Sequence, residues 1–374
     1  MNYLQTEIFN DFLCIGGACT DSCCSMEWGI TIDNEAYERY MKVSGELGKR
    51  LRDNIVTYSD GMHVFLGNEG RCGMQNEDGL CSIQLELNEQ GLCYTCKTFP
   101  RNILTYNKTL ELRSCTLACP EVSRIVVSKK DPIQIEYFEE GYEGKLANTV
   151  LDTNEFILKV RIDILNLIQD RTVPINIRLR GIMLYLLEAN KREKICKWEE
   201  FDFNFDKIND ARFSHNTMLN RLLLYRIIFG DSVGKVDRLK CFMGPYEKYV
   251  LNNKISMDMW NEMNNSFMKE FTPYEYIFEN IAVSYLVTAK FRTAKDDGMI
   301  RPFYELLVIL SNLITTIQIT WMDNNGELLD EDVMNICQKY YKTYEHNEKV
   351  KEYIWNYFMK TKVYSEDFFA GLIG

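Results

Sequence analysis

The run PFYELLVILSNLITTIQITW at residues 302–321 is the most apolar stretch of the chain, and it sets the expected fold class. Its apolar residues recur at three- and four-residue intervals, as on the buried face of an α-helix. Glu305, Asn312 and Gln318 interrupt the run at intervals that a single membrane-spanning helix tolerates poorly. We therefore expect a core helix and no association with a membrane.

Other segments repeat this helical periodicity, and few glycines interrupt them. One more amphipathic segment, Asp33 to Ile55, begins with an Asp-Asn pair suited to capping a helix. The rest of the first 130 residues is rich in turns, with glycines beside many cysteines. The sequence predicts a mainly α fold, with a cysteine-rich, loop-rich N-terminal metal-binding domain at residues 1–130 and a helical C-terminal domain at 131–374. The periodic segments are residues 153–171, 175–193, 214–229, 274–291 and 345–360.

Composition and charge narrow the class of protein. The 374 residues are 46% hydrophobic and 26% charged, which is typical of a soluble globular chain with two domains. The net charge of -11 and the absence of a basic patch argue against nucleic acid as a partner. An acidic surface favours a lysine-bearing substrate, although ordinary solubility explains the same charge. The opening MNYLQTEIFNDF has no features of a secretory signal, so we expect a cytoplasmic protein.

Cysteines are concentrated at the start of the chain, since ten of the 13 lie before residue 120. In a reducing compartment such a cluster indicates a metal or redox centre more often than a disulfide framework, the alternative for an exported protein. Thiolates suit zinc and iron-sulfur clusters. Only Cys93 and Cys96 have the CxxC spacing of a zinc pair, and the radical-type CxxxCxxC motif is absent. The segments are CIGGACTDSCC (14–24), RCGMQNEDGLC (71–81), GLCYTCKTFPR (91–101) and RSCTLACPE (113–121).

These motifs carry a resemblance to a known family. The order CxxxxCxxxCC, then Trp28 and ITID, then EDGLC, GLCYTCKTFPR and CPEVSR resembles the flagellin lysine-N-methylase family. FENIAVSYLVTAKF (278–291) and YEHNEKVKEYIWNYF (344–358) resemble the C-terminal half of that methylase. The resemblance implies methylation of lysine side chains on flagellin by a methyltransferase. It also implies S-adenosylmethionine as the methyl donor and a [4Fe-4S] cluster in the cysteine-rich region.

The resemblance also implies a set of metal ligands. A four-iron cluster takes four protein thiolates, or three when one iron is left open. Nine matching cysteines therefore exceed one cluster, so either a second metal is bound or some thiols are neighbours that tune the cluster. An open iron would allow the methyl donor to chelate it through its amino and carboxylate groups. The matching positions are Cys14, Cys19, Cys23, Cys24, Cys72, Cys81, Cys93, Cys96 and Cys119.

A lysine acceptor sets a chemical requirement of its own. With an ordinary pKa near ~10.4, a lysine amine is protonated at neutral pH and has no lone pair to attack a methyl group. Burial, or a nearby carboxylate or phenolate, must remove that proton. Asp78, Tyr94 and Glu121 lie beside the cysteine motifs and are the catalytic candidates. Arg101 is the candidate for binding the cofactor, through the carboxylate of the methyl donor.

The sequence leaves other functions open. The same cluster and donor suit an enzyme that acts on another peptide or on a small acceptor, and the methyl transfer could be polar or radical. A different class of function is a non-catalytic zinc or iron-sulfur module, whose helical part would bind a partner protein. Metal and methyl-donor binding distinguish these possibilities.

The first prediction concerns the metal. Protein purified without oxygen should be brown and should contain iron together with acid-labile sulfide. Substitution of Cys19, Cys23 or Cys96 by serine should cause loss of the bound metal or of the folded state. Substitution of Cys196, Cys241 or Cys337 by serine should cause neither. Metal and sulfide analysis of each variant is the measurement. Stoichiometric zinc without sulfide would remove the cluster hypothesis.

Overall fold

The computed structural model describes residues 2–24, 29–68, 71–106, 110–138, 153–194, 256–292, 298–345, 348–361 and 365–373, together with residues 220, 221, 224 and 248. Trp28, Cys196, Cys241 and most of the helix predicted at 214–229 lie outside the described residues. The described chain is mostly helical, as predicted, with three small sheets.

The first 138 residues combine short strands with short helices. The strands are β1 (Asn2–Thr6), β2 (Thr31–Ile32), β3 (Ile55–Thr57), β4 (His63–Phe65), β5 (Gly67–Asn68), β6 (Arg71–Cys72), β7 (Arg101–Thr105), β8 (Leu110–Cys115) and β9 (Ile135–Phe138). The helices are α1 (Ile8–Asp11), α2 (Asn34–Lys42), α3 (Gly45–Asp53), α4 (Ser82–Leu87), α5 (Tyr94–Thr98) and α6 (Pro120–Ser128), with 3-10 turns η1 (Gly16–Ala18) and η2 (Glu89–Gly91).

From residue 153 the described chain is helical. Its elements are α7 (Thr153–Ile168), α8 (Ile175–Lys194), α11 (Met257–Phe271), the 3-10 turn η7 (Thr272–Tyr274), α12 (Glu275–Thr288), α13 (Arg301–Asp323), α14 (Asp330–Tyr344), α15 (Glu348–Thr361) and α16 (Glu366–Ile373). The helices predicted at 153–171, 175–193, 274–291, 302–321 and 345–360 are confirmed. In α13, 83% of the most apolar window is buried inside the protein, so this helix, although apolar and long enough to cross a membrane, is the core helix that was predicted.

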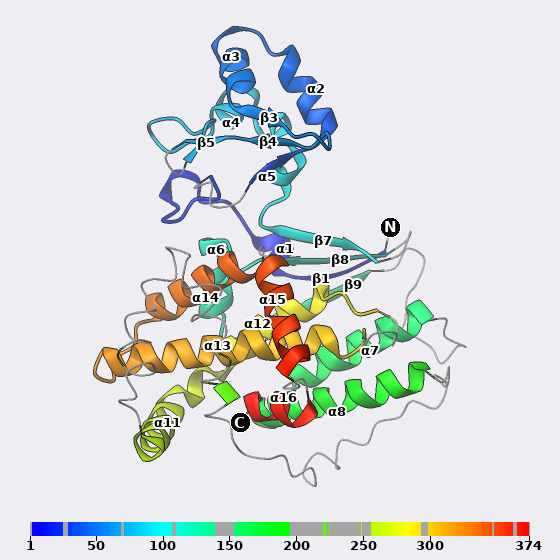
Figure 1. Ribbon diagram of the computed structural model, residues 1–374, viewed down its shortest axis with the longest axis vertical. Helices are drawn as coiled ribbons and strands as arrows, with labels where there is room; N and C mark the ends of the chain where they lie inside the picture. The colour runs from blue at the N-terminus through cyan, green and yellow to red at the C-terminus, as the bar shows by residue number, and fades with distance from the viewer. Residues whose placement is uncertain are drawn as a thin grey trace.

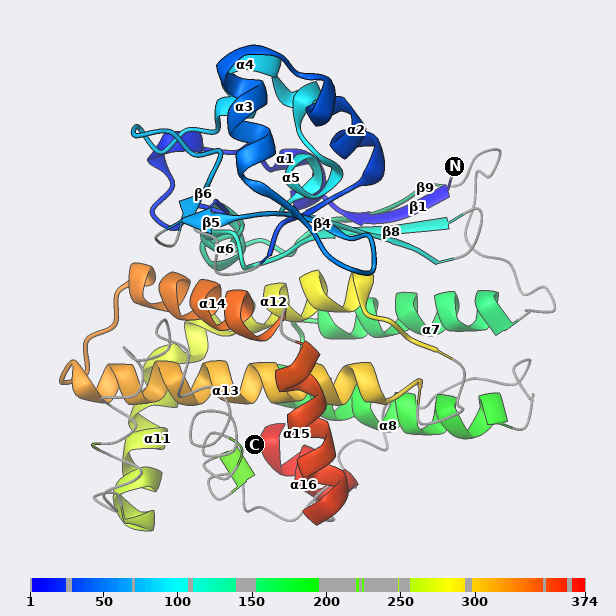
Figure 2. The ribbon, with the colours of Figure 1, turned by 45° about the horizontal axis from the view of Figure 1, so that its top comes forward.

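A four-stranded sheet joins the two ends of the cysteine-rich region and was not predicted. Its strand order is β7-β8-β1-β9, and β1 pairs in parallel with β8, Leu4 opposite Leu112. Inward side chains of both strands are buried, and α12 covers this sheet. In Figure 1, and from another direction in Figure 2, the sheet lies between the short helices α2, α3 and α4 above and the long helices below.

Two separate hydrophobic cores follow from this arrangement. The larger core contains Leu4, Leu112 and Val126 together with the long helices. The smaller core is formed within residues 30–93, around Tyr40, Leu51 and Phe65. We call the described residues from 14 to 98 the small lobe and the remainder the main body. The division predicted at residue 130 stays a prediction about domains, but the packing places both β1 and the segment from β7 to α6 with the helices.

The prediction of one amphipathic helical segment from Asp33 to Ile55 is wrong in one respect, because the segment forms two helices, α2 and α3. Asp33 caps α2 as expected, accepting a hydrogen bond from the Ala36 amide at 2.8 Å. Val43 and Ser44 are extended, and Gly45 has a φ of +73°, a conformation that costs glycine little. The chain therefore turns sharply there, and α2 and α3 pack against each other.

Arg161 of α7 holds the end of α12 inside the larger core. Its side chain is 0% exposed, and its guanidinium donates to the carbonyls of Leu286, Val287 and Ala289 at 2.5, 3.0 and 2.8 Å. Burial lowers the pKa of Arg161 to about 10, still above neutral pH, so the group stays charged. These bonds satisfy carbonyls at the C-terminal end of α12 that have no partner within the helix.

We expect Arg161→Met to be strongly destabilising, because it leaves three buried carbonyls without a donor. A loss of about 2–4 kcal/mol in the free energy of unfolding is expected, since unsatisfied buried groups cost about 1–3 kcal/mol each and the structure relaxes in part. Denaturant unfolding is the measurement. The control is Arg124→Met in α6, where an exposed ion pair should change stability by about 0–1 kcal/mol. Equal losses in the two variants would contradict this account of Arg161.

Candidate functional site

Asp33 positions the CYTC segment of the small lobe. One of its carboxylate oxygens caps α2, and the other accepts from the Tyr94 amide at 2.7 Å, at the start of α5. Burial acts to raise the pKa of Asp33, but the amides of Tyr94 and Ala36 outweigh it and lower the pKa. The Cys93 thiol and the Thr95 hydroxyl both point to the carbonyl of Thr31, at 3.8 and 2.9 Å. Cys93 and Cys96 are therefore held one turn apart at the end of β2.

Arg50 of α3 positions the loop that carries Cys72 and Cys81. Its Nε donates to the carbonyl of Gly73 and its Nη2 to that of Gln75, both at 2.7 Å. Its Nη1 donates to the hydroxyl of Ser82 at 3.1 Å. One guanidinium thus binds both ends of a loop that has little regular structure, which brings Cys81 back beside Cys72.

Asp21 connects the first cysteine segment to α14 of the main body. Its Oδ1 lies 2.5 Å from the Lys342 ammonium, and its Oδ2 accepts from the Gln338 amide at 2.8 Å. The Lys342 side chain is only 1% exposed. Gln338 also donates to the carbonyl of Ala118, at 3.0 Å, next to Cys119. The Asp21–Lys342 pair therefore brings the Cys19–Cys24 segment and Cys119 to the same side of α14.

The nine cysteines predicted as ligands form one electrostatic network, which we call the thiol network. Burial is the main cause that raises the pKa of Cys72 and Cys81, and a hydrogen bond with Cys93 is the main cause for Cys96. A thiolate at Cys23 would raise all three pKa values further. Cys24 is within the same reach of Cys96, and Cys14 is within reach of Cys19. Cys119 is affected by Cys19 and Cys23. The eleven described cysteines are all free thiols. Cys115 interacts with Cys119, whereas no other described thiol acts on Cys337, although Cys337 shares the larger core with both.

Hydrogen bonds between thiols divide the network into pairs. Cys23 bonds to its neighbour Cys24, and this bond raises the pKa of Cys23. Cys96 bonds to Cys93, which lowers the pKa of Cys93 and raises that of Cys96. Among the residues that the structure describes, no three His, Cys, Asp or Glu side chains converge closely enough to hold a metal ion. Thiols are soft ligands of the kind that zinc and iron-sulfur clusters take. In this structure the thiols are gathered as pairs within one region.

The three catalytic candidates do not form a group. Tyr94 is 61% exposed, and Asp78 is exposed in the turn before Cys81. Glu121 is bound by Arg124 of its own helix at 2.6 Å, which lowers the pKa of Glu121. Within the described residues, no hydrogen bond or ion pair joins any two of the three. Their catalytic roles stay predictions.

Arg101 has structural partners in place. Its Nε and Nη2 donate to the carbonyls of Phe9 and Phe12 at 2.9 and 3.0 Å, and its guanidinium lies over both rings. It thereby fixes the end of α1 against β7. Its assignment to the methyl donor stays a prediction, and these bonds offer a structural reason for an arginine at this position.

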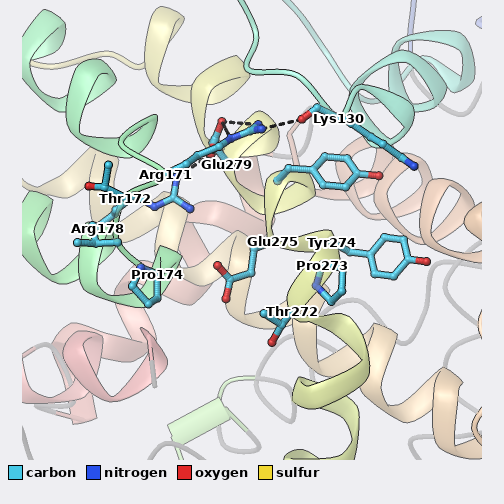
Figure 3. Close-up of a pocket in the computed structure, with 12 residues that line it drawn as sticks. Lys130, Arg171, Thr172, Pro174, Arg178, Thr272, Pro273, Tyr274, Glu275 and Glu279 are labelled. Atoms are coloured by element: carbon cyan, nitrogen blue, oxygen red, sulfur yellow. Dashed lines mark hydrogen bonds and ion pairs between the residues drawn. The ribbon is translucent and has the colours of Figure 1, made fainter.

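A second feature is a cavity of about 640 Å³ in the main body, at the turn between α7 and α8 (Figure 3). At its base Glu279 of α12 is 0% exposed and is bound by two arginines, Arg171 at 2.8 Å and Arg178 at 2.6 Å. Sequence analysis did not identify this group. Glu279 stands within FENIAV, which resembled the methylase, but a glutamate in a helical pattern gives no sign that it is buried. The remaining lining residues are Lys130, Thr172, Val173, Pro174, Thr272, Pro273, Tyr274, Glu275 and Tyr276.

Breaking the Asp21–Lys342 pair from one side should cost more than removing both charges. Asp21→Asn leaves a buried ammonium without its carboxylate, so we expect a loss of about 2–3 kcal/mol, below the value for a fully buried pair because Asp21 is partly exposed. Adding Lys342→Met should restore part of that loss. Unfolding of the two single variants and the double variant is the measurement, and strictly additive losses would refute the coupling.

Comparison with known proteins identifies the family. The model of the FliB lysine N-methylase C-terminal domain matches residues 161–372. Flagellar biosynthetic protein FliU of Salmonella muenchen is 32% identical over 130 residues, which are 33% of this chain and 76% of that protein. Lysine-N-methylases of Salmonella typhimurium (strain LT2) and Salmonella choleraesuis (strain SC-B67) are each 31% identical over 130 residues, 33% of this chain and 32% of theirs. No solved structure gives a significant match.

The match thus spans about a third of the length of the two lysine-N-methylases. It covers more than two thirds of FliU, and the family model covers more than half of this chain, including Arg171, Glu279 and Lys342. The resemblance to the lysine-N-methylase family is therefore confirmed, and the chain belongs to the FliB lysine N-methylase family.

Proposed function

We propose that this protein is a protein-lysine N-methyltransferase that acts on flagellin and uses S-adenosylmethionine as its methyl donor. The observation that carries this proposal is the family match over residues 161–372. The names of two kinds of relative, lysine-N-methylase and flagellar biosynthetic protein, support a lysine acceptor in a flagellar context. The net charge of -11 supports a lysine-bearing partner and disfavours nucleic acid.

We further propose that the thiol network holds a [4Fe-4S] cluster. When bound, such a cluster supplies a redox centre or an open iron that can coordinate a ligand. Cys23, Cys24, Cys93 and Cys96 are the first choice as ligands, because they already form two thiol pairs within electrostatic reach of each other. Cys72 and Cys81 would then be the neighbours that tune it, since the remaining thiols exceed what one cluster takes.

Lys342 is suited to balance the charge of such a centre. Four thiolates in a partly buried region repel each other, and a buried cation offsets that repulsion. The Lys342 ammonium acts on Cys23 in this sense while Asp21 holds it in place. The main body would thereby contribute to the metal centre of the small lobe without supplying a ligand.

The reaction requires a neutral lysine amine. Its lone pair forms the new N–C bond while the C–S bond of the donor breaks, and the electron pair stays on sulfur. The proton of the amine passes to a base or to water. Asp78 and Tyr94 are exposed and so could meet a lysine on a protein surface, whereas Glu121 would first have to leave Arg124.

The test is incubation of anaerobically purified protein with S-adenosylmethionine and flagellin, followed by mass spectrometry of peptides and small molecules. We expect lysines heavier by one or more methyl groups, and one S-adenosylhomocysteine for each group transferred. Cleavage of the donor to methionine and a deoxyadenosine product would instead indicate radical chemistry.

Two cysteine variants provide a matched comparison. Cys96→Ser removes a member of the thiol network and should abolish iron binding, and with it activity if the cluster is required. Cys337→Ala changes a buried thiol outside the network and should keep both. No methylated lysine on flagellin, despite bound iron and bound donor, would refute the proposed function.

A further inference from the structure

The C-terminal end of α14 carries a carboxylate and a phenol whose partners among the described residues are incomplete. We propose that these two groups, Glu345 and Tyr341, bind the amine of the acceptor lysine. This inference rests on the proposed function, because that function supplies a lysine acceptor. It places the lysine on the face of α14 that binds Asp21, beside the thiol network.

One face of α14 is turned toward the first cysteine segment. Lys342 on this face binds Asp21, which lies two residues before Cys23 in the chain. At 3.6 residues per turn, Tyr341 and Glu345 fall on the same face, with Glu345 about 4.5 Å beyond Lys342 along the helix axis. Figure 1 shows this end of α14 on the side of the main body that faces the small lobe.

The Glu345 carboxylate is oriented by neutral donors. The Thr116 hydroxyl donates to its Oε2, and the Asn102 amide donates to its Oε1 at 3.2 Å. Thr116 directly follows β8 and Asn102 lies in β7, so the carboxylate is fixed against the sheet. In the part of the chain that the structure describes, no Lys or Arg forms an ion pair with Glu345, which is only half-buried. A carboxylate held in place without a cation is suited to bind an ammonium group.

The Tyr341 hydroxyl is the second group of the site. Tyr341 is 3% exposed, and its hydroxyl has no hydrogen-bond partner within the described residues. Buried polar groups are nearly always paired, so an unpaired hydroxyl calls for an explanation. Burial and then the nearby Glu345 carboxylate raise the pKa of Tyr341, so the phenol stays protonated. Its oxygen can therefore accept a hydrogen bond from a bound amine.

A lysine ammonium matches the two groups together. It has three N–H donors and no acceptor. Glu345 would take one charge-assisted hydrogen bond and Tyr341 one neutral hydrogen bond. The third N–H carries the proton that has to leave before the amine can attack a methyl group. A lysine that enters past the half-buried Glu345 would meet the Tyr341 hydroxyl one helical turn away.

The experiment compares flagellin methylation by variants of the full chain purified without oxygen. Glu345→Gln should raise the KM for flagellin roughly tenfold, as expected for the loss of one charge-assisted contact. Its amide can still bond to Thr116 and Asn102, so the end of α14 keeps its place. Tyr341→Phe should raise this KM about fivefold, as expected for one neutral hydrogen bond. It should not lower the melting temperature, because the hydroxyl has no described partner to lose.

Two variants of the same helix are matched controls. Tyr340→Phe removes a hydroxyl from the opposite face of α14, and Glu331→Gln removes an exposed carboxylate at its N-terminal end. Both should leave the KM for flagellin unchanged. The KM for S-adenosylmethionine should stay the same in all four variants, whereas a variant that only disturbed folding would change both KM values.

A modified substrate tests the contact without requiring turnover. Flagellin whose lysines are acetylated has no lysine ammonium, so it should bind the wild type more weakly than native flagellin does. In Glu345→Gln this difference in Kd should shrink roughly tenfold, whereas Glu331→Gln should keep it. Calorimetric titration in the presence of S-adenosylhomocysteine is the measurement.

The outcomes separate this inference from the proposed function. Methylation of flagellin by Glu345→Gln and Tyr341→Phe with wild-type KM values would overturn the acceptor site and leave the proposed function standing. Flagellin binding that depends on Glu345 and on free lysine amines, without methylation, would support the site and count against the proposed transfer. No binding of flagellin to the wild type would overturn both.

Discussion

The cysteine segments have little regular structure, so their main-chain amides and carbonyls need hydrogen-bond partners from other segments. The arrangement of the small lobe depends on this requirement. Charged side chains supply these partners. Asp33 holds the amide at the start of the CYTC segment, and Arg50 holds carbonyls on the loop between Cys72 and Cys81. Lys342, from a helix more than 300 residues away in sequence, binds Asp21. Asp33 and Arg50 lie in the small lobe and Lys342 lies on α14, so both the lobe and the main body hold the cysteine segments in place.

The features that could be predicted from the sequence are those that depend on residues close together in the chain. The helices from α7 to α15 follow apolar periodicity within single segments, and five of them were expected. The sheet β7-β8-β1-β9 depends on pairing between Leu4 and Leu112, whose strands are short and far apart in the chain. No pattern within either strand specifies that partner. The break at Gly45 was missed for a related reason, because amphipathic spacing continues across it.

The candidate site shows the same division. Cysteine density and motif order drew attention to the nine thiols, and in the structure each of them interacts electrostatically with at least one other. Proximity in sequence was a poor guide to the other groups: Arg101 follows the CYTC segment closely but binds carbonyls of Phe9 and Phe12. Lys342 and Glu279 stand in ordinary helical patterns, and only tertiary packing shows that they are buried and paired.

Helix α6 connects the two candidate sites and separates them. Cys119 directly precedes its first residue, and Lys130 follows its C-terminal end. There the amide of Asn280 in α12 donates to the carbonyls of Val126 and Lys129 at 3.1 and 2.7 Å. At a rise of about 1.5 Å per residue, the helix places the cavity rim about 15 Å from Cys119. Because α6 packs against both α12 and α14, it ties the position of the Cys119 end to that of the cavity rim.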